Sequence, residues 1–524
     1  MNKSKYKTLA AIHIGSEMIS LQIVEYRDLE NIKILEQASH RVKLGEETFK
    51  NKRIPFSMVS EICELLKGYK RLMEEYGTEE YTVQATTAVR EAENQVYFLD
   101  QIHTKTGLKV DVVDMPREIY TKYAAIQRTL NKEGIGNGCG VLLVDISSGG
   151  LGITYVSDGK IKYQQNLHIG IIRIKEDFDR TQKSSLFFSR ALTEYISSTI
   201  GPVRKDLEEE DVKYFVLSGT ETELILKMLG RDSCKSRVER VQAADFIAFY
   251  DKIRTMNLSQ IIKVFNIEET SAEIIFPTII LYQQLLALVP AQEIIVMPNR
   301  FIDGMMFLSI ASRTNDEYAD ILHEELMSLI HCIGERYDYD YAHVKQVEML
   351  ALEMFDKLSK KQCLDEHSRL LLRAACILHD IGKYICLRSH ALYSYQLIMA
   401  SDILGFSDMD KRVVALTTYY HSHLLFENQN EGRPRVNKSC MPLVAKLAAI
   451  LRLADAMDRS YMQKIEKCKV TLKGNEMVIH AVSRKDLTLE EWTFDNKKNF
   501  FVEVFGLTPV LERVGGRKDN GGLE

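Results

Sequence analysis

The sequence predicts an α/β N-terminal half made of two similar lobes, followed by an all-helical domain and a small α/β cap. A strand, a glycine-containing turn and a returning strand at residues 8–26 recur at residues 140–157. Both copies continue with strands and amphipathic helices, which indicates helices packed on a partly parallel sheet. From about residue 313 to about residue 465 the apolar spacing is helical. This order is typical of two ribonuclease-H-like lobes of the actin and sugar-kinase type, followed by a helical domain.

Length and composition limit the class of protein. A chain of 524 residues is expected to form about three or four domains. The net charge of −5 argues against a protein devoted to nucleic acid. The nine cysteines form no CxxC pair, which favours a reducing compartment. The first apolar run is short and Ser16 and Glu17 follow it, so we expect no signal peptide. Because no run approaches about 18 apolar residues, we expect a soluble cytoplasmic protein with no membrane and no nucleic-acid partner.

Each lobe is predicted to contain five strands. In the first lobe the strands cover residues 8–14, 18–26, 32–41, 81–86 and 110–113, with helices at 57–76, 91–106 and 118–130. In the second lobe the strands cover 140–146, 151–157, 160–167, 213–217 and 293–297, with a helix at 272–288. A linker with three glycines, residues 131–138, separates the two copies.

The C-terminal part is predicted to be mostly helical. Helices are expected at 316–334, 341–358 and 443–459, and an apolar helical run at 370–376. Strands at 469–472, 477–480 and 500–505 would form the small cap, and the glycine-rich tail is expected to be disordered. The predicted domains are 1–132, 133–312, 313–465 and 466–514, followed by the tail at 515–524.

A histidine and an aspartate stand side by side in the stretch Ile-Leu-His-Asp-Ile-Gly-Lys at residues 377–383. Adjacent helical side chains diverge by about 100°, so His379 and Asp380 can share one ion only at a helix end. A divalent metal needs further protein ligands, and His343 and Asp455 are suitable candidates. His390 and His421 lie between. The alternative for one His-Asp pair alone is a capped helix end without metal.

This set resembles the HD-domain metal phosphohydrolases over roughly residues 316–465, in the motifs 341–344, 378–383, 420–421 and 451–459. The resemblance implies a metal site made by His343, His379, Asp380 and Asp455. His390 and His421 could complete a second ion site, and Lys383 could donate a proton or bind phosphate. Imidazole and carboxylate ligands suit Mg²⁺, Mn²⁺, Fe or Zn, so the identity of the metal stays open.

Four further segments resemble the exopolyphosphatase/guanosine pentaphosphate phosphohydrolase (Ppx/GppA) family. Residues 10–16, 144–150 and 217–220 stand at its glycine-containing phosphate turns, and residues 86–92 resemble its Thr-Ser-Ala-Val-Arg-Asp-Ala stretch. This resemblance covers residues 8–310, and longer family members carry an HD-like helical domain behind the two lobes. It implies release of terminal phosphate from inorganic polyphosphate or guanosine pentaphosphate with Mg²⁺ or Mn²⁺, and a possible homodimer.

The resemblance also assigns residues. Glu118 stands at the catalytic glutamate and Asp145 at a ligand of the cation. The phosphate-binding residues implied by the family pattern are Gly15, Ser16, Arg90, Ser148, Gly149, Gly150, Gly219 and Thr220.

Three departures from the family pattern concern this site. His13 replaces an aspartate, Ser147 and Ser148 replace two glycines, and Gly152 replaces an acidic residue. Because Mg²⁺ prefers oxygen ligands, the loss of two carboxylates weakens the prediction of a metal here. Three hypotheses follow: an active phosphohydrolase using Glu118 and Asp145, an HD-site nucleotide phosphohydrolase or phosphodiesterase with an inactive N-terminal cleft, and a degraded phosphate-ligand sensor or partner-binding protein.

Overall fold

The computed structural model describes residues 6–147, 150–170, 174, 188–208, 210–219, 221–231, 238–297, 299–422, 434 and 439–514. The chain divides into two compact units between Leu329 and Ile330, inside α15 (Glu317–Arg336). Three predicted phosphate-binding residues, Ser148, Gly149 and Thr220, and the predicted disordered tail lie outside the described residues.

The first sheet of the N-terminal unit has the order β3-β2-β1-β4-β5. Its strands are β1 (Lys7–Ile14), β2 (Met18–Tyr26), β3 (Ile32–Arg41), β4 (Tyr81–Ala85) and β5 (Asp111–Val112). The first three are antiparallel neighbours, and β1, β4 and β5 run parallel. All five predicted strands are confirmed. The interior of β1 is buried, as expected for a strand covered on both faces.

Helices follow the strands of this sheet closely. They are α1 (Leu44–Asn51), α2 (Phe56–Glu75), α3 (Thr87–Arg90), α4 (Gln95–Thr106) and α5 (Met115–Lys132). The predicted helix at 91–106 begins late, because the side chain of Asn94 bonds the backbone N–H and C=O of Ile54 at 2.9 Å each and holds residues 91–94 in a turn. Helix α5 begins where Asp114 caps the N–H of Arg117, with Pro116 in the first turn.

The second sheet repeats the first, with one additional strand. Its strands are β6 (Gly140–Ile146), β7 (Leu151–Ser157), β8 (Lys160–Leu167), β9 (Val212–Ser218), β10 (Glu239–Gln242) and β11 (Glu293–Met297), in the order β10-β11-β9-β6-β7-β8. Without β10, the order and strand directions match those of the first sheet. The predicted internal repeat is therefore confirmed, while the short edge strand β10 was not predicted.

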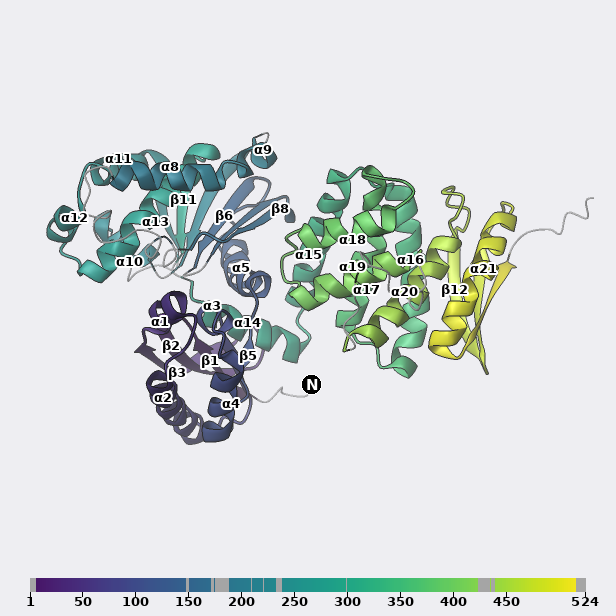
Figure 1. The fold of residues 1–524 in the computed structure, drawn as a ribbon, viewed down its shortest axis with the longest axis horizontal. Coiled ribbons are helices and arrows are strands. Elements are labelled where there is room, and N and C mark those ends of the chain that lie inside the picture. Colours follow the sequence, from purple (N-terminus) through teal and green to yellow (C-terminus); the bar gives the residue numbers. More distant parts are fainter. Residues whose placement is uncertain are drawn as a thin grey trace, which may run out of the picture. The chain divides into compact units, whose positions relative to one another are not determined.

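The helices of this half include the longest apolar helix of the N-terminal unit. They are α8 (Phe188–Ile200), α9 (Val203–Leu207), α10 (Thr222–Met228), α11 (Ala243–Ile253), α12 (Leu258–Phe265), α13 (Glu269–Leu288) and α14 (Phe301–Thr314), and Figure 1 shows α8 and α11 along one side of the sheet. Within the described residues, only α13 is long and apolar enough to span a membrane, and 61% of that segment is buried. It packs against α8 and α12, as a core helix does.

The C-terminal unit begins with a bundle of helices. They are the end of α15, α16 (Tyr341–Gln362), α17 (Glu366–Leu378), the 3₁₀ turn η1 (Ile381–Tyr384), α18 (His390–Ala400), α19 (Asp408–Tyr420) and α20 (Met441–Ala456). Helix α17 ends at Leu378, so His379 and Asp380 follow a helix end as predicted. Three of these helices begin at side-chain caps, Asp340 before α16, Asp365 before α17 and Ser407 before α19.

The small α/β cap packs on this bundle and contains one wrong prediction. Its sheet has the order β12-β13-β14, with β12 (Lys467–Lys473), β13 (Glu476–Val482), β14 (Thr508–Val514) and helix α21 (Thr488–Phe505). The predicted strand at 500–505 is the end of α21. Phe494, Phe501 and Phe505 are buried at helical spacing on one face of α21. Burial of this face favours a helix and outweighs the β-propensity of the aromatic run. The third strand of the cap is β14, which was not predicted.

Substitution of Gly304 in α14 tests the close packing of α14 on α5. A Cβ at this position would lie 1.9 Å from the Thr121 backbone oxygen, so Gly304→Ala should destabilise the protein by about 1–3 kcal/mol in urea unfolding. Gly68, exposed inside α2 with open space around it, is the matched control, and Gly68→Ala should add about 0.5–1 kcal/mol. Equal effects of the two substitutions would contradict this packing.

Candidate active sites

The two sheets bring equivalent residues to the ends of equivalent strands. His13 is the penultimate residue of β1, and Asp145 is the penultimate residue of β6. His13 Nε2 lies 3.2 Å from Thr86 Oγ1 at the end of β4, and Ser218 Oγ at the end of β9 donates to Asp145 Oδ1 at 2.8 Å. His13 therefore occupies in the first sheet the position that Asp145 occupies in the second.

A lysine that was not predicted holds Asp145. Lys122 Nζ donates to Asp145 Oδ2 at 2.9 Å, and the side chains of both residues are nearly buried, at 12% and 7% exposure. Burial alone lowers the pKa of Lys122, but the Asp145 and Glu118 carboxylates outweigh it and the pKa lies above its ordinary value. Lys122 is therefore a permanent ammonium. Its signal in the sequence is its place four residues after Glu118, on the same face of α5.

Glu118 is buried in the first turn of α5 and is held by α3. Its Oε2 accepts from Thr87 Oγ1 at 3.3 Å and from Arg90 Nη1 at 3.2 Å. Arg90 also donates to the carbonyl of Val113 at 2.6 Å. Arg90, predicted to bind phosphate, is thus brought to the predicted catalytic carboxylate, where it fixes the position of that carboxylate.

The turns predicted to bind phosphate are partly described. Gly15 N–H donates to Met18 O at 3.0 Å and closes the first turn, which contains Ser16. Ser147 Oγ accepts from Gly150 N–H at 3.1 Å and fills part of the second turn with a side chain. Gly219 has φ +139° in the third turn, a conformation that favours glycine.

The position of the missing acidic residue is physically filled. A Cβ built on Gly152 would lie 2.8 Å from Ile119 Cδ1, with two further Ile119 carbons within 3.2 Å. Ile119 is buried next to Glu118 on α5. A carboxylate at position 152 therefore requires the side chain of Ile119 to move.

We name His13, Thr86, Glu118, Lys122, Asp145 and Ser218 the strand-end cluster. Its donors do not fit a divalent cation that prefers oxygen ligands. His13 offers a nitrogen ligand, and Gly152 has no side chain that could be a ligand. Asp145 and Glu118 are each paired with a cationic side chain. The pKa of His13 is lowered to about 3 by burial, with a further contribution from Lys122, so the ring is neutral at pH 7.

The C-terminal unit brings four histidines together with their Nε2 atoms available. His379, His390 and His421 each use Nδ1 to bond the backbone carbonyl three residues before, at Cys376 (2.7 Å), Leu387 (3.1 Å) and Thr418. His343 uses Nδ1 to bond Asp458 Oδ2 at 2.9 Å. Such bonds fix the tautomer and orient Nε2 toward a ligand.

Two carboxylates complete this group. His379 Nε2 lies 3.4 Å from Asp380 Oδ2 and 4.0 Å from Asp455 Oδ1. His343 Nε2 lies 3.8 Å and 3.6 Å from the same two atoms. His390 Nε2 lies 3.6 Å from Asp380 Oδ1, and His421 approaches the same carboxylate. We name these six residues the histidine–aspartate cluster.

This cluster fits a metal ion. The Nε2 atoms of His343 and His379 are buried without a hydrogen-bond partner, which is costly unless a ligand satisfies them. Donor atoms 3.4–4.0 Å apart can surround an ion with bonds of about 2.1 Å. Burial alone would lower the pKa of His343, but the nearby carboxylates of Asp455 and Asp458 outweigh burial and raise this pKa to about 9. A bound cation would displace that proton.

Lysine and tyrosine side chains surround the carboxylates. Lys383 Nζ donates to Asp380 Oδ2 at 2.5 Å, and Tyr461 Oη donates to the same atom at 2.7 Å. Lys497 of α21 donates to Asp455 Oδ2 at 2.5 Å. Tyr461 also stacks on His343, with ring centroids 3.8 Å apart. Tyr461 and Lys497 were not predicted, because they lie outside the motifs.

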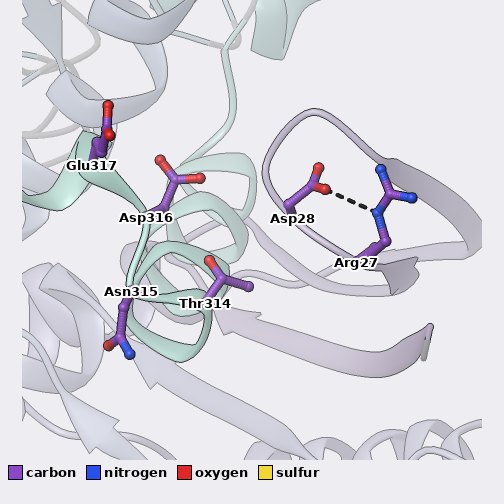
Figure 2. Close-up of a pocket in the computed structure, with 6 residues that line it drawn as sticks. All are labelled: Arg27, Asp28, Thr314, Asn315, Asp316 and Glu317. Carbon is purple, nitrogen blue, oxygen red and sulfur yellow. Dashed lines mark hydrogen bonds and ion pairs between the residues drawn. The ribbon is translucent and has the colours of Figure 1, made fainter. Parts of the chain in front are cut away.

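A shallow pocket elsewhere does not belong to either cluster. It has a volume of about 470 Å³ and is lined by Arg27, Asp28, Thr314, Asn315, Asp316 and Glu317. Figure 2 shows that Arg27 is paired with Asp28, at 3.0 Å, which leaves the lining mostly acidic. A polyphosphate would be repelled there.

Comparison with known proteins decides the family. The profile of the Ppx/GppA phosphatase family matches residues 22–312, and the profile of domain III of Ppx/GppA phosphatases matches residues 327–497. The chain belongs to the Ppx/GppA phosphatase family. As a family member it is an enzyme of the phosphoanhydride hydrolase class.

Individual relatives extend this result. The chain is 21% identical over 500 residues to the guanosine-5'-triphosphate,3'-diphosphate pyrophosphatase of Vibrio atlanticus, covering 93% of each chain. It is 30% identical over 183 residues to the bifunctional 3-dehydroquinate synthase/phosphatase of Fusobacterium nucleatum, covering 33% of this chain and 27% of that protein.

Solved structures show the same fold in the N-terminal half. A Ppx/GppA family member from Aquifex aeolicus has a TM-score of 0.51 at 21% identity, covering 59% of this chain and 99% of that one. An exopolyphosphatase from Cytophaga hutchinsonii has a TM-score of 0.52 at 17% identity, covering 58% of this chain and 98% of that one. The predicted pair of ribonuclease-H-like lobes of this Ppx/GppA protein is thereby confirmed.

The neutral His13 of this Ppx/GppA protein predicts a pH dependence. In the unfolded chain a histidine binds a proton below about pH 6.5, whereas His13 in the fold binds one only near pH 3, so stability should fall as pH decreases between these values. His13→Gln should lose less stability than the wild type between about pH 7.5 and about pH 5 in urea unfolding. The exposed His103 of α4 provides a matched control, and His103→Gln should retain the wild-type loss. The same loss in His13→Gln would contradict the assignment.

Proposed function

We propose that the chain releases terminal phosphate from inorganic polyphosphate or guanosine pentaphosphate, and that the strand-end cluster performs this reaction. The observation that carries the proposal is the position of Glu118, a buried carboxylate whose Oε2 is fixed by Thr87 and Arg90. A carboxylate that is held in one position and shielded from bulk solvent is suited to orient and deprotonate a single attacking water. Both substrate classes are supported by the relatives' names, a guanosine phosphate pyrophosphatase and an exopolyphosphatase.

In this proposal Glu118 Oε1 takes a proton from the water as the water oxygen attacks the terminal phosphorus. The anhydride bond breaks and the shortened substrate departs as the leaving group. The turns that contain Gly15, Ser16, Gly150 and Gly219 would bind phosphate oxygens, together with Ser148, Gly149 and Thr220. Gly15 and Gly150 would contribute by shaping their turns, because their N–H groups already donate to Met18 O and Ser147 Oγ. Asp145 would act through Lys122 and would not ligate a cation, because it is already paired with that ammonium.

A second candidate function is favoured by a specific observation in the C-terminal unit. The unpartnered Nε2 atoms of His343 and His379 support a metal site of the HD type, with Asp380 and Asp455 as further ligands and His390 and His421 for a second ion. A divalent metal, Mg²⁺, Mn²⁺, Fe or Zn, would supply an activated water and charge for hydrolysis of a nucleotide phosphoester. Lys383 would bind phosphate or donate a proton, beside Tyr461.

We also propose an HD-type helical domain at residues 313–465 and a cap at 466–514, behind lobes at 1–132 and 133–312. A cytoplasmic location without membrane or nucleic-acid partners, and a homodimer, belong to the same proposal. The burial of α13 in a protein core supports the absence of a membrane span.

Substitution of Glu118 tests the first function. Glu118→Gln keeps an acceptor for Thr87 and Arg90 but removes the base, so phosphate release from polyphosphate and from guanosine pentaphosphate should fall by at least about 100-fold in kcat. Glu133→Gln, on an exposed residue following α5, should keep the wild-type rate. Wild-type activity in Glu118→Gln would exclude this function for the strand-end cluster.

Metal binding tests the second function without any activity assay. Titration calorimetry with Mn²⁺ should show binding to the wild type, weakened at least about tenfold in His379→Ala. His367→Ala, at an exposed histidine of α17, the helix that His379 follows, should bind as the wild type does. Chelation of the metal should lower the melting temperature of the wild type and of His367→Ala, but not that of His379→Ala. Equal Mn²⁺ affinity in the three proteins would exclude a metal site at His379.

A further inference from the structure

Lys122 lies where the ends of three strands meet. Its ammonium donates to Asp145 on β6 and lies one helical turn after Glu118. It lowers the pKa of His13 on β1, and its own pKa is raised in part by Glu221, which precedes α10. We propose that the Lys122 ammonium replaces a divalent cation in the strand-end cluster, so that this cluster binds a terminal phosphate group without a metal ion. The inference rests on the proposed function of the cluster and specifies how it holds its substrate.

The first argument is that the ligands of a cation are missing. His13 is neutral, bonds Thr86 and packs against the ring of Phe301, with centroids 4.6 Å apart. Gly152 has no side chain, and Ile119 occupies the space in which a carboxylate would extend. Two of the positions that could neutralise a divalent ion therefore contribute no negative charge.

The second argument is that the remaining carboxylates are already neutralised. Asp145 is bonded by Lys122 and Ser218, and Glu118 by Arg90 and Thr87. A divalent ion at Asp145 would have to displace an ammonium held at 2.9 Å, in a site with little solvent to screen the repulsion. The two carboxylates of the cluster are thus each matched by a positive side chain, Lys122 for Asp145 and Arg90 for Glu118.

The third argument is that a lysine can replace the ion chemically. An ammonium is a compact charge with three N–H donors and is a common phosphate ligand. The described contacts use one of these donors, at Asp145 Oδ2. The others can donate to phosphate oxygens held by the turns at Gly15 and Gly219. Lys122 then supplies in one covalent group the positive charge that a cation would otherwise carry.

The test measures binding of tripolyphosphate by titration calorimetry, once in excess EDTA and once with Mg²⁺. Wild type should bind with the same affinity in both conditions. Lys122→Met should weaken binding at least about tenfold in both, because a charged contact is lost. Lys132→Met is the matched control, since Lys132 lies on the same helix and pairs with Glu30 at its exposed end. This control should bind like the wild type.

Asp145→Asn distinguishes a site in which Asp145 ligates Mg²⁺ from a site in which Lys122 binds the phosphate. If Asp145 ligated Mg²⁺, its loss would abolish Mg²⁺-dependent binding. If Lys122 binds the phosphate, loss of its carboxylate partner should leave tripolyphosphate binding in EDTA equal to that of the wild type or tighter.

Folding of the variants is checked by thermal melting, because Lys122→Met leaves a buried carboxylate unpaired. The double variant Lys122→Met/Asp145→Asn removes both charges, so it should fold and still bind as weakly as Lys122→Met. Wild-type affinity in the double variant, absence of binding in EDTA, or a requirement for Mg²⁺ would each overturn the inference. Lysine-dependent binding in EDTA without any phosphate release would instead uphold the inference and reject the proposed reaction.

Discussion

The ion pair between Lys122 and Asp145 is the constraint on which the N-terminal unit depends. It joins a helix that follows the first sheet to the end of a strand in the second, and both side chains are nearly buried. Removing two charges from water is expensive, and their attraction compensates only when further hydrogen bonds are made. Ser218 supplies one of these bonds to Asp145. Burial keeps His13 neutral by lowering its pKa, and the ammonium of Lys122 lowers that pKa further.

The two clusters of this chain use opposite chemistry. In the strand-end cluster each carboxylate is matched by a lysine or an arginine, which leaves positive groups available to an anion. In the histidine–aspartate cluster the imidazoles are held by backbone carbonyls and by Asp458, which leaves nitrogen and oxygen donors available to a cation. In the functions proposed for this Ppx/GppA protein, the first cluster binds phosphate alone and the second binds phosphate together with a metal.

Local sequence patterns were sufficient to predict much of this architecture. The repeated strand–turn–strand segments predicted both sheets, because short apolar runs and glycine turns are local signals. The four motifs contain five members of the histidine–aspartate cluster, and the sixth, His390, lies between two of the motifs. The strand predicted at 500–505 was wrong, because this segment is the end of α21. An aromatic run has high β-propensity whether it finally packs in a sheet or on one face of a helix.

The residues that could not be predicted depend on contacts between distant segments. Lys122 is recognisable as a neighbour of Glu118 on α5, but its role follows only from the proximity of Asp145, which belongs to the other sheet. Tyr461 and Lys497 reach the carboxylates from segments after α20, one of them through the cap helix α21. No spacing rule links such positions, since tertiary packing alone brings them together.

The contact between Ile119 and Gly152 limits which substitutions position 152 accepts. Because the isoleucine fills the volume next to the glycine, an aspartate or glutamate at position 152 would meet a steric clash before it gained a ligand. Such a carboxylate fits once the Ile119 side chain moves or a smaller residue stands at position 119. A paired substitution at positions 119 and 152 is therefore the direct route to a further carboxylate beside the strand-end cluster.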